Sequence, residues 1–291
     1  MSLLQTVTEL VILGLFLGAF YGLAALGLSL VFGVQSVVNL AHGEFIMIGA
    51  YLAFFGWSIF NLHPVLAIAV AAPIMFVFGV AIQWGLLERI DLNEELTTLI
   101  FTFGLALALR GFATSTVPVD YESISFLSES VSLGPATFSM NRPFAFVVAV
   151  GAMALFFVFL RYTDWGKAIR ATSQNAEISR ACGIRTKRVR MVSFGLGSVL
   201  AGIAGGVAGI LYVIFPAMGL QYLLRTFVVV ILGGLGSLVG AVLAGLGFGL
   251  IRSFGTWYLS STIASLLAFG LLVVVLLVRP QGLMGRKDSP E

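Results

Sequence analysis

Long stretches without a charged side chain limit what this sequence can fold into more than any other feature. After Glu44 the next acidic or basic residue is Glu88, and the residues between them are mostly apolar. Across the 291 residues, 59% are hydrophobic and 10% are charged, whereas about a quarter of the residues in a soluble domain are charged. Since a helix needs about 20 apolar residues to cross a bilayer, the sequence predicts an all-α polytopic membrane protein.

Eight stretches are long and apolar enough to be membrane segments. They cover residues 10–33, 41–60, 65–87, 97–117, 143–160, 191–213, 226–251 and 258–278. The first and the seventh are long enough to be broken or re-entrant. We expect the segments to form a single transmembrane domain, residues 1–291, with an internal pseudo-repeat.

Two connections between these segments are long and differ in charge. Residues 118–142 contain three acidic residues and one arginine, whereas residues 161–190 contain eight basic and two acidic residues. Because Lys and Arg are enriched in cytoplasmic loops, residues 161–190 are predicted to be cytoplasmic and residues 118–142 external. Counting from this loop places residues 88–95 inside, although that connection is acidic.

The C-terminal tail, residues 279–291, constrains the seventh segment. The tail contains Arg279, Arg286 and Lys287, so it is predicted to be cytoplasmic, which requires that segment 226–251 does not cross. The run 227–234 is too short to span a bilayer and leads into GGLGS (233–237). We expect a hairpin that enters from outside, turns at GGLGS and returns. Irregular backbone at that depth is tolerated where it is packed in protein or lines a watery cavity, so the turn is either a pathway element or a glycine-packed bend.

Small residues recur at every fourth position in three segments. They are Gly14, Gly18 and Gly22, then Ala201, Gly205 and Gly209, and then Ala241, Gly245 and Gly249. Such faces let helices approach closely in lipid. We expect most of them to pack within the chain.

The cytoplasmic loop contains the signals of a short helix. Thr172 or Ser173 is a suitable N-cap, residues 174–182 are good or tolerable helix formers, and Gly183 suits the position after a helix end. Because a helix this short is marginal in water, a contact must hold it. That contact is either with anionic lipid headgroups or with a soluble partner.

The stretch NLAHGE (39–44) places Asn39, His42 and Glu44 at the start of an apolar segment. Two interpretations are open. An unwound stretch beside a translocation path would have its polar groups satisfied by water or partners. Alternatively, His42 and Glu44 support a helix start, where a carboxylate fits the helix dipole.

Motifs for chemistry are absent from the sequence. It has no HExxH and no second histidine near His42 that would suggest a metal site, no GxSxG nucleophile and no GxxxxGK[ST] phosphate loop. Arg110 and Arg252 are expected near the membrane interfaces, and the central parts of most segments are uncharged. The chain is therefore expected neither to hydrolyse ATP nor to act as an enzyme.

Three sequence blocks and the tail resemble a known family. The blocks are GLAALGLSLVFGVQSVVNLAHGEFIMIGAYLA (22–53), GKAIRATSQNAEISRACGIRTKRVRMVSFGLGSVLAGIAG (166–205) and VVVILGGLGSLVGAVLAGL (228–246), followed by RPQGLMG (279–285). They resemble the membrane permease subunits of branched-chain amino-acid ABC importers, and the NxAHGE…GAY pattern is closer to the LivH-type subunit than to its LivM-type partner. Permeases of urea and short-amide importers have very similar motifs, so those substrates stay open as an alternative.

The resemblance implies one subunit of a larger importer in a bacterial or archaeal inner membrane. A second, LivM-type permease would form a heterodimer with this chain, two ATP-binding subunits would bind ATP and Mg²⁺, and an external solute-binding protein would deliver the substrate. No cofactor, metal or nucleic acid is expected in this chain. A stand-alone secondary transporter and an intramembrane enzyme are the competing classes, and the charge-poor segments and missing catalytic spacings count against them.

The resemblance also implies two sets of functional residues. The pathway would be flanked by Asn39, His42, Gly43, Glu44, Gly233, Gly234, Gly236 and Ser237. A coupling helix would seat in an ATPase groove through Gln174, Asn175, Ala176, Glu177, Ser179, Arg180, Gly183 and Ile184.

Overall fold

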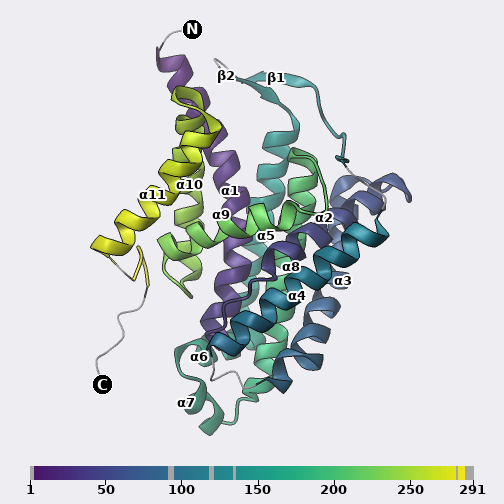
Figure 1. Ribbon diagram of the computed structural model, residues 1–291, viewed down its shortest axis with the longest axis vertical. Helices are drawn as coiled ribbons and strands as arrows, with labels where there is room; N and C mark the ends of the chain where they lie inside the picture. The colour runs from purple at the N-terminus through teal and green to yellow at the C-terminus, as the bar shows by residue number, and fades with distance from the viewer. Residues whose placement is uncertain (1–2, 91–94, 118–120, 134–135, 280, 286–291) are drawn as a thin grey trace.

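The computed structural model describes residues 3–90, 95–117, 121–133, 136–279 and 281–285, and these are mostly helical (Figure 1). The helices are α1 (Leu3–Gln35), α2 (His42–Ser58), α3 (Pro64–Gly85), α4 (Glu95–Thr116), α5 (Asn141–Tyr162), α6 (Asp164–Gln174), α7 (Ala176–Ala181), α8 (Thr186–Leu211), α9 (Met218–Gly233), α10 (Leu238–Tyr258) and α11 (Ser261–Val278). A 3₁₀ turn, η1 (Leu87–Arg89), follows α3. Strands β1 (Ser130–Leu133) and β2 (Ala136–Ser139) pair antiparallel before α5.

Seven of the described helices are long and apolar enough to cross a membrane: α1, α3, α4, α5, α8, α10 and α11. Helix α2 has 17 residues and α9 has 16, so both are shorter. The chain is a multi-pass, all-α membrane protein, as predicted. The first segment is not broken, because α1 is one continuous helix of 33 residues. The internal pseudo-repeat stays a prediction.

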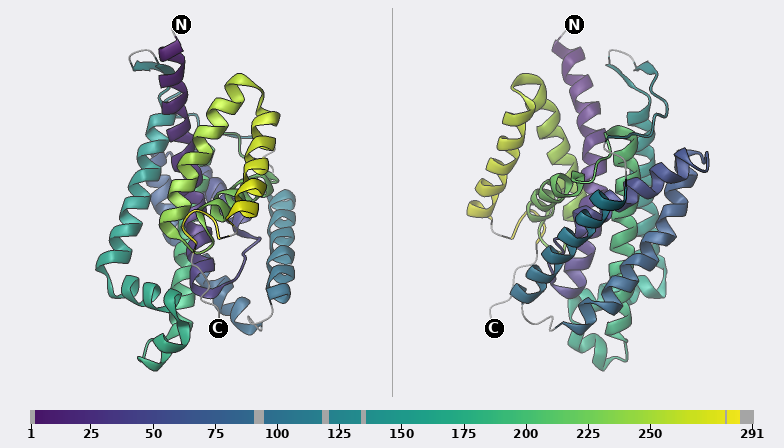
Figure 2. Two further views of the ribbon diagram at one scale, coloured as in Figure 1. Left: turned by 90° about the vertical axis from the view of Figure 1, so that its left-hand side faces the viewer. Right: turned by 45° about the vertical axis from the view of Figure 1, so that its right-hand side comes forward.

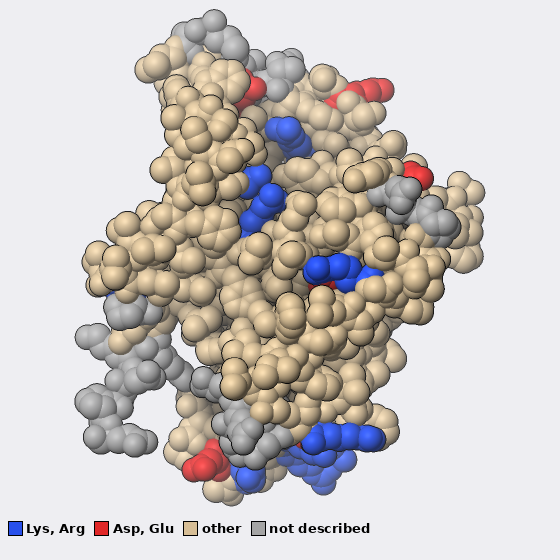
Figure 3. All heavy atoms as spheres, viewed as in Figure 1, with Lys and Arg blue, Asp and Glu red and all other residues tan. Residues whose placement is uncertain are grey.

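The two ends of the helix bundle differ in charge. Figure 1 places the N-terminus and the β-hairpin at one end, and α6 and α7 at the other. Basic side chains gather at the α6–α7 end (Figure 3). The positive-inside rule predicts that this end is cytoplasmic and that the β-hairpin end is external. The chain alternates between the ends through α3, α4, α5 and α8, as the sequence predicts.

An ion pair explains why the connection after α3 is acidic. Arg190 of α8 donates to both carboxylate oxygens of Glu88 at 3.0 and 3.1 Å, and Lys187 Nζ lies 3.7 Å from Glu88 Oε2. Gln83 donates to Glu88 at 3.4 Å and accepts from Gln35 at 3.2 Å. The acidic residue therefore belongs at the same end as the basic loop, and it links the ends of α1 and α3 to the start of α8.

Helices α9 and α10 form the predicted hairpin. Figure 1 and Figure 2 show α9 crossing the middle of the molecule and α10 returning to the external end, from which α11 runs back. The turn lies at residues 234–237, within GGLGS. The hairpin is longer than the expected 226–251, because polar side chains do not stop α9: Arg225 donates to the Tyr21 hydroxyl at 3.3 Å.

The small-residue ridges pack within the chain, as predicted. A Cβ at Gly18 of α1 would lie 2.9 Å from the carbonyl oxygen of Gly245 in α10. On α8, Gly205 is so close to α2 that a Cβ there would overlap the carbonyl of Ile46. Most of the central part of α1 and of α8 is buried, and the buried side chains form one continuous core. These close approaches fix α2 and α10 against the two central helices.

Candidate functional site

The NLAHGE stretch is part connection and part helix. Residues 36–41 are not helical, and α2 begins at His42. The buried Asn39 accepts a hydrogen bond from the Ala41 amide at 3.0 Å. The His42 Nε2 lies 3.0 Å from the carbonyl oxygen of Ala24 in α1, and the side chain is fully buried. Both side chains therefore hold the connection and α2 in place, and neither reaches the surface of this chain.

Glu44 forms an ion pair that the sequence alone did not predict. Arg110 of α4 donates from Nε to Glu44 Oε1 at 3.2 Å, and its Nη2 contacts the same oxygen. The Glu44 side chain is 2% exposed and that of Arg110 is 25% exposed. Basic and acidic atoms meet at mid-height of the molecule, where α2 and α4 cross (Figure 3). Arg110 was expected near an interface. A lone glutamate and a lone arginine in uncharged segments are themselves a signal, because charges within membranes usually pair.

Gly43 and Gly219 bring α9 against the start of α2. A Cβ at Gly43 would overlap the Gly219 carbonyl, and a Cβ at Gly219 would contact the Glu44 carboxylate. The second carboxylate oxygen of Glu44, Oε2, has no hydrogen-bond partner among the described residues. The first turn of α9 is thus seated on the ion pair.

The GGLGS turn depends on glycine backbone geometry. Gly234 and Gly236 have φ values of +97° and +78°, in the left-handed region that favours glycine. Ser237 caps α10, because its hydroxyl accepts a hydrogen bond from the Gly240 amide at 3.1 Å. A Cβ at Gly33 would lie 3.1 Å from the Gly236 carbonyl oxygen, so the turn rests against the end of α1.

The C-terminal RPQGLMG motif closes this turn. The amides of Leu283 and Met284 donate to the carbonyl oxygens of Leu232 and Gly233 at 2.8 and 3.0 Å. They satisfy carbonyl groups that the end of α9 leaves free. The tail segment 281–285 therefore caps the end of α9 through backbone hydrogen bonds, and we call it the tail clasp. Nothing in the RPQGLMG motif itself indicates this role.

Helix α9 connects the two stretches predicted to flank the pathway. Gly219 at its start contacts Gly43 and Glu44. Gly233 at its end lies fourteen residues further along, about 21 Å at the rise of an α-helix. The NLAHGE and GGLGS stretches thus lie at opposite ends of α9. Their role beside a pathway stays a prediction, and α9 is the element that any such pathway would follow.

The loop predicted to be cytoplasmic contains two helices rather than the one expected at 174–182. Gln174 is the last residue of α6, and the cap of α7 is Asn175 rather than Thr172 or Ser173. The Asn175 side chain accepts from the amides of Glu177 and Ile178, both at 2.9 Å. Two capping bonds from one side chain favour starting the helix there.

Gly183 ends α7 as predicted. Its φ is +84°, its amide donates to the Arg180 carbonyl at 3.0 Å, and the Ile184 amide donates to the Ser179 carbonyl at 3.0 Å. This pair of bonds is the Schellman motif.

The outer face of α7 is exposed. Glu177, Ile178, Arg180 and Cys182 are exposed and Ala176 is half-buried, whereas Ser179 is buried against this chain. Ile178 is 63% exposed, which is high for a large aliphatic side chain in a six-residue helix. The assignment of this face to an ATPase groove stays a prediction.

Comparisons with known proteins agree with these features. Residues 10–276 match a family model described as "Branched-chain amino acid transport system / permease component". The chain is 30% identical to the high-affinity branched-chain amino acid transport system permease protein LivH of Escherichia coli strain K12, over 94% of each chain. It is 29% identical to BraD, the corresponding permease protein of Pseudomonas aeruginosa, over 94% of each chain. It is also 29% identical to the probable permease protein LivH of Methanocaldococcus jannaschii, over 90% of this chain and 88% of that one.

A solved structure is similar in fold. The PsaBC complex from Streptococcus pneumoniae, bound to a Fab, contains a chain that superposes with a TM-score of 0.52 at 12% identity, covering 92% of this chain and 91% of that one. At this identity the likeness concerns the fold alone. Since the family model spans nearly the whole chain, the chain belongs to the family of permease components of branched-chain amino acid transport systems.

Proposed function

We propose that this chain is the membrane subunit of an ABC importer that carries branched-chain amino acids into the cell. The match of residues 10–276 to the permease family supports this most strongly. The short α9 lies between the NLAHGE and GGLGS stretches, which suits a pathway element. The sequence also has no phosphate-binding loop. The work of ATP hydrolysis therefore falls to separate subunits.

The assembly would use three surfaces of the chain. The second permease, of the LivM type, would face α4, α9 and α11. Large apolar side chains are exposed on α4 and α11, including Phe112 at 67% and Leu266 at 65%. The ATP-binding subunits, which hold ATP and Mg²⁺, would receive α7. The external solute-binding protein would dock at the β-hairpin end, and the complex would lie in an inner membrane.

Purification of the chain from its native membrane tests this assignment. An affinity tag on this chain should recover a second permease and two ATP-binding subunits, and added binding protein should carry leucine, isoleucine or valine. Recovery of the chain without ATP-binding subunits would contradict the proposal. If the binding protein instead carries urea or a short amide, the proposed substrate is wrong and that compound class takes its place.

A further inference from the structure

Three arginines near the predicted external end differ from Arg110 in their partners. Among the described residues, Arg142, Arg225 and Arg252 form no ion pair, whereas Arg110 is paired with Glu44. A guanidinium stays charged under all ordinary conditions. Charged side chains in membrane segments generally pair or face a watery cavity, and they often mark substrate pathways.

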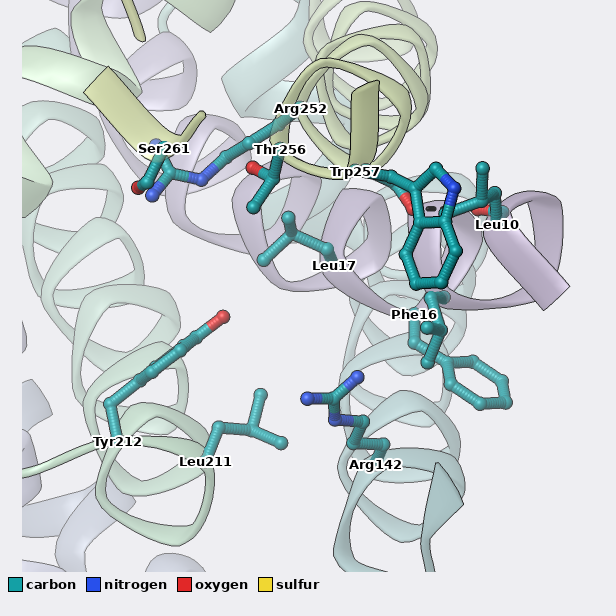
Figure 4. A pocket seen from close by; sticks show the side chains of 12 residues that line it. Leu10, Phe16, Leu17, Arg142, Leu211, Tyr212, Arg252, Thr256, Trp257 and Ser261 are labelled. Atoms are coloured by element: carbon teal, nitrogen blue, oxygen red, sulfur yellow. Dashed lines mark hydrogen bonds between the residues drawn. The ribbon is translucent and has the colours of Figure 1, made fainter. Parts of the chain in front are cut away.

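Arg142 and Arg252 line the same cavity. It has a volume of about 340 Å³ and lies between α1, α5, the end of α8, α10 and the start of α11. This is within the range of about 300–1,000 Å³ typical of small-molecule sites. Figure 4 shows the Arg142 guanidinium and the Tyr212 hydroxyl pointing into the space, with Leu17 at its side. The apolar part of the lining includes Phe16 and Trp257.

Arg252 also lines a second cavity of about 180 Å³, together with Arg225 of α9. The two cavities therefore share one guanidinium, and the three arginines lead from the external end toward α9. Tyr212 lines the first cavity together with Arg142 and Arg252. Figure 3 shows basic atoms at successive heights on the upper half of the face that carries α9.

The neutral partners of these arginines are weak. Arg225 donates to the Tyr21 hydroxyl at 3.3 Å and Arg252 to the Ser265 hydroxyl at 3.4 Å. No acidic residue lines either cavity in the described part of the chain. Glu9 precedes the cavity residue Leu10 but is in no ion pair among those described. The site thus has an excess of positive charge that an anion from outside would balance.

We infer that Arg142, Arg252 and Arg225 successively hold the carboxylate of the amino acid as it moves from the external end toward α9. The planar guanidinium matches a carboxylate in two parallel hydrogen bonds. The ammonium group can lie against the rings of Tyr212 and Trp257, and an aliphatic side chain against Phe16 and Leu17. This inference rests on the proposed function, and it favours amino acids over urea, which has no carboxylate.

The test is leucine uptake by the complete importer in proteoliposomes, with leucine-loaded binding protein and internal ATP. We expect Arg252→Gln and Arg142→Gln each to lower the uptake rate by about tenfold or more, as the loss of one charged partner implies. Arg252→Lys keeps the positive charge but loses the planar guanidinium that can make two parallel hydrogen bonds, so it should retain an intermediate uptake rate. Arg161→Gln, at the cytoplasmic end of α5, is the matched control and should transport normally. Affinity for the binding protein and basal ATP hydrolysis should be unchanged in all variants.

Several results would overturn the inference. Normal uptake by both glutamine variants would do so. So would a loss of uptake matched by weaker docking of the binding protein, since the arginines would then hold that protein. A defect seen only in liposomes that contain phosphatidylglycerol would identify a lipid headgroup as the anion, and an equal defect in Glu9→Gln would identify Glu9 as the missing counterion. If the wild-type complex fails to import leucine, the proposed function itself is refuted.

Discussion

Replacing Arg110 with glutamine removes the only charged partner that the structure shows for Glu44. The carboxylate would stay in place, because Gly219 and α2 enclose it and leave its side chain 2% exposed. Removing one partner of a buried ion pair typically costs about 3–5 kcal/mol. Since Arg110 is 25% exposed and water can reach its place, we expect Arg110→Gln to lower the free energy of unfolding by about 2–3 kcal/mol, below that range.

The double variant Glu44→Gln/Arg110→Gln separates the charge from the packing. It leaves no unpaired charge, so it should recover most of the loss and unfold within about 1 kcal/mol of the wild type. The free energies can be measured by dodecyl sulfate titration of the purified chain in mixed micelles, with circular dichroism as the readout. Lys167→Gln is the control, because the pair of Lys167 with Asp164 is exposed and should matter by less than about 0.5 kcal/mol. A double variant as unstable as Arg110→Gln, or a stable Arg110→Gln, would refute the reasoning.

Three further changes test the turn and the cytoplasmic helix. Gly234→Ala places a side chain at a φ of +97° and against the tail clasp. It should lower the free energy of unfolding by at least about 1–2 kcal/mol. A dodecyl sulfate titration curve unchanged from the wild type would contradict this. Asn175→Ala removes the cap of α7 and should weaken that helix by about 1 kcal/mol, seen as faster amide exchange of its residues; equal exchange rates would show that the cap is dispensable. If α7 sits in an ATPase groove as proposed, Ala176→Trp should overpack that groove at a cost of about 1–3 kcal/mol. Uptake and substrate-stimulated ATP hydrolysis should then be lost while the permease still inserts. Uptake by this variant at the wild-type rate would indicate instead that residues 161–190 form an anchor that contacts lipid.

The features that follow from local sequence were predictable. The hairpin turn followed from a short apolar run and the GGLGS sequence after it, whereas the orientation drawn from the lysines and arginines of residues 161–190 stays a prediction. Gly183 marked the end of α7, because glycine favours the left-handed conformation there. The exact start of α7 was not predictable, since Thr172, Ser173 and Asn175 are all good caps. Which of them is used depends on where α6 ends.

The features that join distant segments could not be derived from the sequence alone. Glu44 and Arg110 are 66 residues apart, and Glu88 and Arg190 are 102 apart. Each charge is visible in the sequence, but its partner depends on how the helices cross. The contact of Leu283 with the carbonyl of Leu232 uses backbone groups, which every residue carries, so no side-chain pattern indicates it.

The most direct test of the central claim is ATP-driven uptake by a reconstituted complex. Proteoliposomes would contain this chain, the second permease and the two ATP-binding subunits, with leucine-loaded binding protein outside. We predict that labelled leucine accumulates inside only when the vesicles contain ATP and Mg²⁺, and that this chain alone neither accumulates leucine nor hydrolyses ATP. Leucine accumulation by this chain alone, driven by an ion gradient, would contradict the account and identify a secondary transporter.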